Sequence, residues 1–243
     1  QASMRDWDLL AQEGRLNAAQ KHFWEIKPHE ELYDLQSDSD EVNNLAASPA
    51  HRATLERLRR AQDAWMSSIH DTGLLPEPEM RARAEGSTPY ELGHDAQRYA
   101  YARIKRAADL AAGGRAAATA ELVKLLANPD AAIRYWAATG LLIRQEAGVT
   151  AGGAALRKAL DDAAPSVRIA AAEALGRYGT PDDRPRAARI LLAHAAVAAN
   201  GPYVATFAWN AIDHLPLDTL RSLKSELAAI DAGPPTGFAT PPP

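Results

Sequence analysis

The stretch LVKLLANPDAAIRYWAATGLL at residues 122–142 is followed by LRKALDDAAPSVRIAAAEALG at residues 156–176, and the two align at a constant offset of 34 residues. Leu, Ile or Val, Arg and Ala recur at the same places in both, and a looser copy follows at residues 204–212. Each copy shows the apolar period of a helix, a short turn with Asp or Pro, and the period of a second helix. Because one helix pair cannot bury its apolar face alone, the sequence predicts a stack of helix pairs.

The segments AIRYWAA (residues 132–138) and SVRIAAAEALG (residues 166–176) make the unit resemble a HEAT repeat, closely over residues 115–180 and loosely over residues 181–230. The resemblance implies a mainly α fold, a HEAT-like α-α superhelix. Arg134 and Arg168 share one phase of the second helix, so we expect them to lie one above the other and to bond to turn carboxylates or carbonyls. An alanine-rich helical bundle with accidental periodicity is the alternative.

The composition limits the kind of core and the kind of partner. Hydrophobic residues make up 47% of the 243 residues but aromatics only 6%, so small side chains on closely packed helices must form the core. The net charge of -4 argues against a nucleic-acid partner, because phosphate binding needs clustered Lys and Arg. The chain has no cysteine, which excludes disulfides and cysteine nucleophiles. No apolar run of about 20 residues is present, so no membrane span is predicted.

The first 75 residues have a different pattern. Residues 1–21 predict two short helices broken at Gly14, and apolar and polar residues then alternate at 23–26 and 31–35, which predicts two short strands. Two strands alone are marginal in water, so we expect them to complete a sheet supplied elsewhere. The acidic turn at 38–45 suits Asx-turn and capping roles better than a calcium site. Ser48 and Pro49 then open a long helix.

Proline and glycine place the predicted boundaries. Pro76, Pro78, Gly86 and Pro89 mark a connector, and the glycine pairs at 113–114 and 152–153 are expected at helix starts. The predicted organisation is a small α+β unit at 1–75, a connector with a helix at 76–112, helical repeats at 113–232 and a disordered Pro-rich tail at 233–243.

The most specific stretch is KPHEELYDL at residues 27–35 with DSDEVNNLA at residues 38–46. This stretch resembles the C-terminal end of sulfatases of the alkaline-phosphatase superfamily, which include arylsulfatases and N-sulfoglucosamine sulfohydrolases. In that family a strand of the form ELYDL precedes a D-P-x-E-x-x-N-L turn and a helix, and here Ser39 replaces the proline. The resemblance covers about residues 5–80, so it implies that residues 1–75 end a sulfatase C-terminal subdomain.

What the resemblance implies is a hydrolase of sulfuric esters whose catalytic parts lie upstream. The family uses a formylglycine made in a Cys/Ser-x-Pro-x-Arg motif and a calcium ion held by Asp and Asn oxygens. The stretch Ser87 to Glu91 imitates that motif but has Glu where Arg is needed, and it lies downstream of the ELYDL strand. No catalytic, cofactor-binding or metal residue is therefore assigned, calcium is implied for the parent protein, and the isolated chain is expected to be inactive.

The expected partners are a missing upstream catalytic domain and either a sulfated substrate or a protein. The alternative is a stand-alone HEAT-like interaction module. The repeats carry candidate contact aromatics for a partner: Tyr135, Trp136, Tyr178, Tyr203, Phe207 and Trp209. The compartment is left open, although an exported parent would place the chain in the periplasm or outside the cell.

Overall fold

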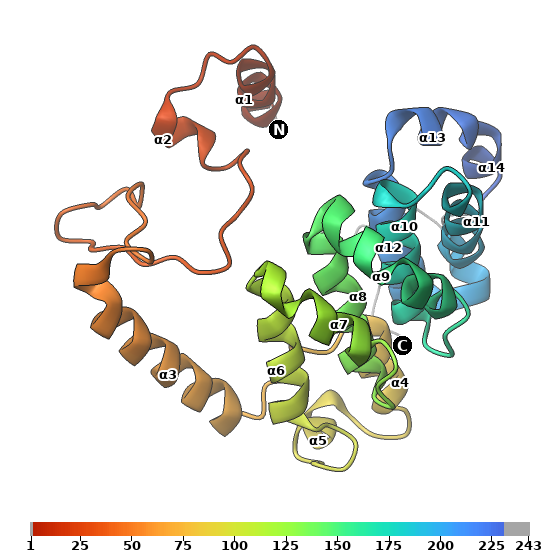
Figure 1. Cartoon of the computed structure of the whole chain (residues 1–243), viewed down its shortest axis with the longest axis horizontal. Coiled ribbons are helices and arrows are strands. Elements are labelled where there is room, and N and C mark those ends of the chain that lie inside the picture. Colours follow the sequence, from red (N-terminus) through yellow and green to blue (C-terminus); the bar gives the residue numbers. More distant parts are fainter. Residues whose placement is uncertain (1, 231–243) are drawn as a thin grey trace, which may run out of the picture. The chain divides into compact units, whose positions relative to one another are not determined.

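A computed structural model describes residues 2–230 and divides into two units, one up to Ile69 and one from His70 (Figure 1). Helices make up most of the described residues, which confirms the mainly α prediction. The predicted tail at 233–243 lies outside the described residues.

The first unit contains helices that are separated by a long irregular segment. These are α1 (Ala2–Gln12), α2 (Ala18–Lys21), the 3₁₀ turn η1 (Pro49–His51) and α3 (Arg52–Ser68). Gly14, with φ of 69°, breaks the chain after α1 as predicted, because glycine adopts positive φ without steric cost. Asn17 and Gln20 form a reciprocal capping box that starts α2. Local signals therefore account for the end of α1 and the start of α2.

The two predicted strands, at 23–26 and 31–35, are absent from the described residues, so this part of the prediction was wrong. Residues 22–25 form a turn, and residues 31–34 are irregular. Leu45 N–H donates to the Leu32 carbonyl at 2.7 Å, but the Asn44 side chain takes the neighbouring positions by accepting from Leu32 N–H and donating to the Glu30 carbonyl. Alternating residues do not form a strand unless a second strand supplies the ladder of hydrogen bonds.

The second unit is built from two layers of helices. We call α8 (Ala131–Ile143), α10 (Pro165–Tyr178) and α12 (Val197–Asp213) the B layer. The A layer is α7 (Thr119–Leu125), α9 (Gln145–Ala159) and α11 (Asp183–Ala195). Each B helix packs on the next, and α6 (Tyr101–Ala112) extends the layer by packing on α8. This is the predicted arrangement of stacked helix pairs.

Small side chains let the helices of the stack approach closely. Ala137, Ala138, Ala171 and Ala172, which repeat at the offset of 34, are fully buried. The glycine pair at 152–153 lies inside α9 rather than at a helix start, which corrects that expectation. A Cβ atom at Gly152 would stand 2.5 Å from a Leu141 methyl, so this glycine permits the contact between α9 and α8.

The segment from 76 to 112, predicted as a connector with a helix, contains α4 (Glu77–Arg83), α5 (Pro89–Gly93) and α6. Helix α4 packs on α10 and α12 of the B layer. Leu75, Leu92, Tyr99 and Ile104 form a small core with the start of α8. The chain continues after the stack into α13 (Leu217–Ser222) and α14 (Lys224–Ala229), and a 3₁₀ turn, η2 (Ala116–Ala118), precedes α7.

Within residues 2–230, no single helix is both long and apolar enough to cross a membrane. Helices α11 and α12 satisfy that length and composition only when taken together, and they are bent by 117°.

Candidate interaction surface

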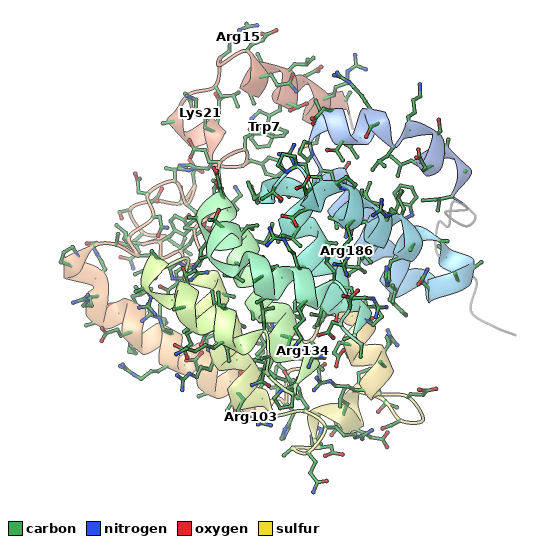
Figure 2. All side chains as sticks on the ribbon, turned by 45° about the vertical axis from the view of Figure 1, so that its right-hand side comes forward. Trp7, Arg15, Lys21, Arg103, Arg134 and Arg186 are labelled. Atoms are coloured by element: carbon green, nitrogen blue, oxygen red, sulfur yellow. The ribbon has the colours of Figure 1, made fainter. Side chains whose placement is uncertain are left out.

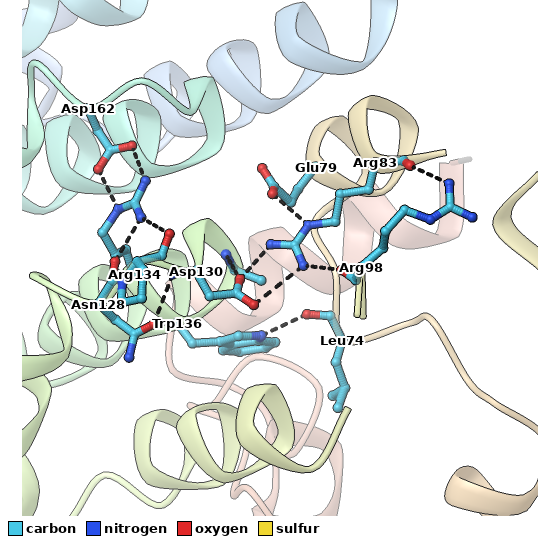
Figure 3. Close-up of polar contacts among 11 residues, drawn as sticks. Leu74, Glu79, Arg83, Arg98, Asn128, Asp130, Arg134, Trp136 and Asp162 are labelled. Carbon is cyan, nitrogen blue, oxygen red and sulfur yellow. Dashed lines mark hydrogen bonds and ion pairs between the residues drawn. The ribbon is translucent and has the colours of Figure 1, made fainter. Parts of the chain in front are cut away.

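A row of ionic and polar bonds links successive turns of the stack (Figure 3). Arg134 donates to both carboxylate oxygens of Asp162 in the next repeat, at 2.6 and 2.7 Å, and to the carbonyls of Asn128 and Pro129. Arg83 of α4 likewise donates to both carboxylate oxygens of Asp130, which lies in the turn between α7 and α8. The predicted bonding of Arg134 to turn carboxylates and carbonyls is confirmed.

Arg168 continues this row with a different partner. It donates to the carbonyls of Asp162 and Ala163 and to His194 Nε2, the latter at 3.1 and 2.8 Å. His194 Nδ1 lies 2.7 Å from the Ile190 carbonyl, so the ring is a neutral tautomer that donates there and accepts from Arg168. A histidine therefore stands in the third repeat where a carboxylate stands in the second.

The row shifts the protonation of its members. Burial raises the pKa of Asp162, but the hydrogen bonds from Arg134 and from the Ala164 N–H, together with the charges of Arg134 and Arg168, outweigh it, so the pKa of Asp162 lies below its ordinary value. Burial lowers the pKa of His194, and the Ile190 bond opposes this while the charge of Arg168 adds to it. The row thus holds Asp162 charged and His194 neutral.

A hollow of about 130 Å³ opens on the B layer. Residues from all three B helices line it. Tyr135 and Thr139 of α8 lie 34 residues before Ile169 and Glu173 of α10, so they occupy equivalent positions in successive repeats. The lining is completed by Leu142, Ala170, Phe207, Asn210 and Ala211. Burial raises the pKa of Tyr135 against the effect of a Thr139 hydrogen bond, with the nearby Glu173 charge reinforcing the rise.

The predicted contact aromatics have different surroundings. Tyr135 and Phe207 line the hollow. Trp136 is half-buried and donates its indole N–H to the Leu74 carbonyl at 2.8 Å, and Tyr203 is 41% exposed beneath the Arg81 guanidinium. Helix α4 and its flanking residues thus already cover part of the B layer.

The two remaining aromatics lie away from the hollow. Tyr178 is half-buried beneath Arg177, and half-buried Trp209 donates to the Ala195 carbonyl at 3.0 Å. A role for any of these aromatics in binding a partner stays a prediction. Sequence reasoning missed Thr139, Glu173 and Asn210, although the offset of 34 relates Thr139 to Glu173.

The described residues contain no group of three His, Asp or Glu side chains that is placed to hold a metal ion. Asp38 instead accepts from the backbone N–H groups of Val42 and Asn43, the capping role expected for this turn. Ser87 donates to Glu91, and Thr88 caps α5, so both hydroxyls of the stretch resembling the maturation motif have local structural partners. The calcium ion implied for the parent protein stays a prediction.

The stacked aromatic cluster of the first unit is a second feature that the structure brings together. Trp7, labelled in Figure 2, lies 4.9 Å from Phe23 and 5.6 Å from Trp24 between ring centroids. Phe23 and Trp24 are nevertheless exposed, as are Ile26 and Leu35. Large exposed apolar side chains that gather in one unit are typical of a surface that packs on another polypeptide segment.

Two comparisons with known proteins found similar sequences. Residues 119–209 match the family of HEAT repeats. The chain is also 40% identical over 79 residues to the ulvan-active sulfatase of Formosa agariphila, a match covering 32% of this chain and 13% of that sulfatase. No solved structure matches. The chain is therefore similar to a sulfatase over a short part of that protein, and it contains a segment similar to HEAT repeats.

Proposed function

We propose that this chain is the C-terminal part of a sulfatase polypeptide. Residues 1–75 complete the C-terminal subdomain, and the HEAT-like repeats form a scaffold beside the substrate cleft. The observation that carries the proposal is the 40% identity to a sulfatase over 79 residues, which we assign to the region of the ELYDL and DSDEVNNL stretches. Such a chain contributes to substrate access and assembly, and the ester hydrolysis takes place upstream.

The exposed apolar side chains of the first unit support this proposal. Phe23, Trp24, Leu35 and Trp65 are exposed, and Leu16 is the one buried apolar side chain among residues 2–69. A unit that is complete in itself buries most of its large apolar residues, because their burial offsets the loss of chain entropy. We assign these side chains to contacts with the upstream sulfatase domain.

The first test concerns the gene. We expect a Cys/Ser-x-Pro-x-Arg motif in the same reading frame, some hundreds of codons upstream of Gln1. A start codon at Met4 preceded by an in-frame stop would contradict the proposal and favour the alternative, a stand-alone HEAT-like interaction module, which the repeat match also supports.

The second test concerns activity. The purified chain is expected not to hydrolyse an aryl sulfate, with or without calcium, whereas the longer polypeptide with a matured formylglycine should do so. Truncating that polypeptide before residue 113 should raise KM for a sulfated polysaccharide while leaving kcat/KM for a small aryl sulfate unchanged. Equal loss with both substrates would show that the repeats only stabilise the protein.

A further inference from the structure

The hollow on the B layer has an incompletely satisfied carboxylate in its wall. Glu173 is only 15% exposed, and it receives hydrogen bonds from Arg177 at 3.1 Å and from His214 at 2.8 Å. Both bonds end at Oε1, and among residues 2–230 no donor bonds to Oε2. A carboxylate oxygen without a protein donor, on a side chain that is mostly buried, is a ready acceptor for an incoming N–H group.

Two aromatic rings line the hollow together with this carboxylate. The centroids of Tyr135 and Phe207 are 6.0 Å apart, with the rings inclined by 50°. The faces of aromatic rings carry negative partial charge and attract a Lys or Arg cation. Ile169, Ala170 and Leu142 supply apolar wall, which suits the methylene stem of the same side chains. An anion would instead meet the charge of Glu173.

The B layer already holds a cation of this kind one helical turn away. Arg81 of α4 lies over the ring of Tyr203, with the guanidinium carbon 4.7 Å from the centroid. Tyr203 and Phe207 are four residues apart on α12, so their side chains share a face of that helix. The layer thus binds an arginine from a helix of its own chain, and the adjacent hollow has similar aromatic walls with a carboxylate added.

We propose that the hollow binds a lysine or arginine side chain of a partner polypeptide, which docks on the B layer beside α4. The net charge of -4 favours a basic partner over an acidic one. Arg177 already neutralises part of the Glu173 charge, so a single guest side chain binds weakly, and the rest of the partner must add to the affinity. This inference does not rest on the sulfatase proposal, because it concerns a surface contained within the repeats.

The test uses the ¹⁵N-labelled full chain and four small probes in NMR titrations. The probes are the N-acetyl, N′-methylamide derivatives of lysine, arginine, norleucine and glutamate. We expect lysine and arginine to shift the amide signals of Thr139, Ala170 and Asn210 at millimolar concentration, and the uncharged norleucine to shift them much less. Glu173→Gln should weaken lysine binding about tenfold, which is the typical effect of losing one charge-assisted hydrogen bond.

Matched variants separate binding from folding. Phe207→Leu keeps an apolar side chain but removes the ring, and it should also weaken lysine binding. Asp161→Asn removes a carboxylate that is 70% exposed and outside the hollow, and it should leave lysine binding unchanged. Equal shifts with norleucine and lysine, stronger binding of glutamate, or no shift with any probe would overturn the proposal. Unchanged lysine binding in a folded Glu173→Gln protein would do the same.

Discussion

The two units use the same kind of local structure but differ in what they bury. Both consist of helices with recognisable starts, such as the capping box of α2 in the first unit and the Asp130 cap of α8 in the second. Residues 2–69 nevertheless bury one apolar side chain, Leu16, whereas the repeats share a core that extends from Ala111 to Leu215. Capping and amphipathic patterning form helices in either context, but a core requires a neighbouring element with a matching apolar face.

The largest expected effect is the loss of stability when a leucine is shortened to alanine, and it should differ between the two units. Leu175→Ala, at a fully buried position of α10, should lower the free energy of unfolding by about 4 kcal/mol, because it leaves a cavity in a closely packed core. Leu58→Ala, at a position of α3 that is 42% exposed, should cost less than about 0.5 kcal/mol. Urea unfolding followed by circular dichroism measures both, and similar costs would mean that the units do not differ in packing.

A smaller effect is expected from the arginines that pair with carboxylates in the two units. Arg134→Met should cost about 3 kcal/mol, because it leaves Asp162, with only 11% of its side chain exposed, without its partner. Arg59 also pairs with Glu30 through two bonds, but its side chain is 48% exposed, so Arg59→Met should cost below about 1 kcal/mol. A double-mutant cycle with Asp162→Asn measures the coupling energy between Arg134 and Asp162. A negligible coupling energy would contradict the role of this pair in stabilising the stack.

The third effect depends on pH and on His194. Its pKa in the folded protein lies below the value of 6.5 for an unperturbed histidine, so the unfolded chain takes up the proton first as pH falls. The stabilisation due to neutral His194 is therefore complete above pH 6.5 and is lost progressively below it. His194→Gln, which retains an acceptor but does not titrate, should flatten the decline in melting temperature between about pH 6.5 and pH 5.

Its matched control is His22→Gln in the first unit, since that imidazole is 53% exposed. The control protein retains His194, so the decline in its melting temperature below about pH 6.5 should persist. An unchanged slope in His194→Gln would show that the Arg168–His194 contact does not control the acid sensitivity.

The smallest effect concerns tryptophan exposure without a change in stability. Trp65 of α3 is 61% exposed, whereas Trp209 is half-buried and hydrogen-bonded to Ala195. Trp65→Phe should therefore reduce the fraction of fluorescence that acrylamide quenches, and Trp209→Phe should raise it. The opposite ranking would mean that α3 is covered in solution.

Much of the second unit was predictable because its pattern is repeated. The offset of 34 fixes which residues are equivalent, so the buried alanines and the shared phase of Arg134 and Arg168 follow from the sequence. The first unit has no such redundancy, and a few alternating residues at 23–26 and 31–35 favoured strands that the structure lacks. Strand pairing depends on a distant partner, which a short alternating pattern does not specify.

The candidate site was harder to predict than the repeats around it. Six aromatics were selected by type, yet only Tyr135 and Phe207 of these line the hollow, and Trp136 and Trp209 bond to carbonyls of the protein itself. Glu173 was not selected, because an isolated Glu in an alanine-rich helix has no sequence signal of its own. The packing of α8, α10 and α12 places it beside Tyr135 and Phe207.

The sequence by itself determined that the chain is helical, where the repeats lie and which of their positions are equivalent, because these properties depend on local periodicity. The tertiary structure decided that α4 covers part of the B layer and that the Leu141 side chain packs against Gly152. It also decided that His194 rather than a carboxylate pairs with Arg168. These contacts join residues 11 to more than 100 positions apart along the chain, and side-chain packing selects among such pairings only when the helices have come together.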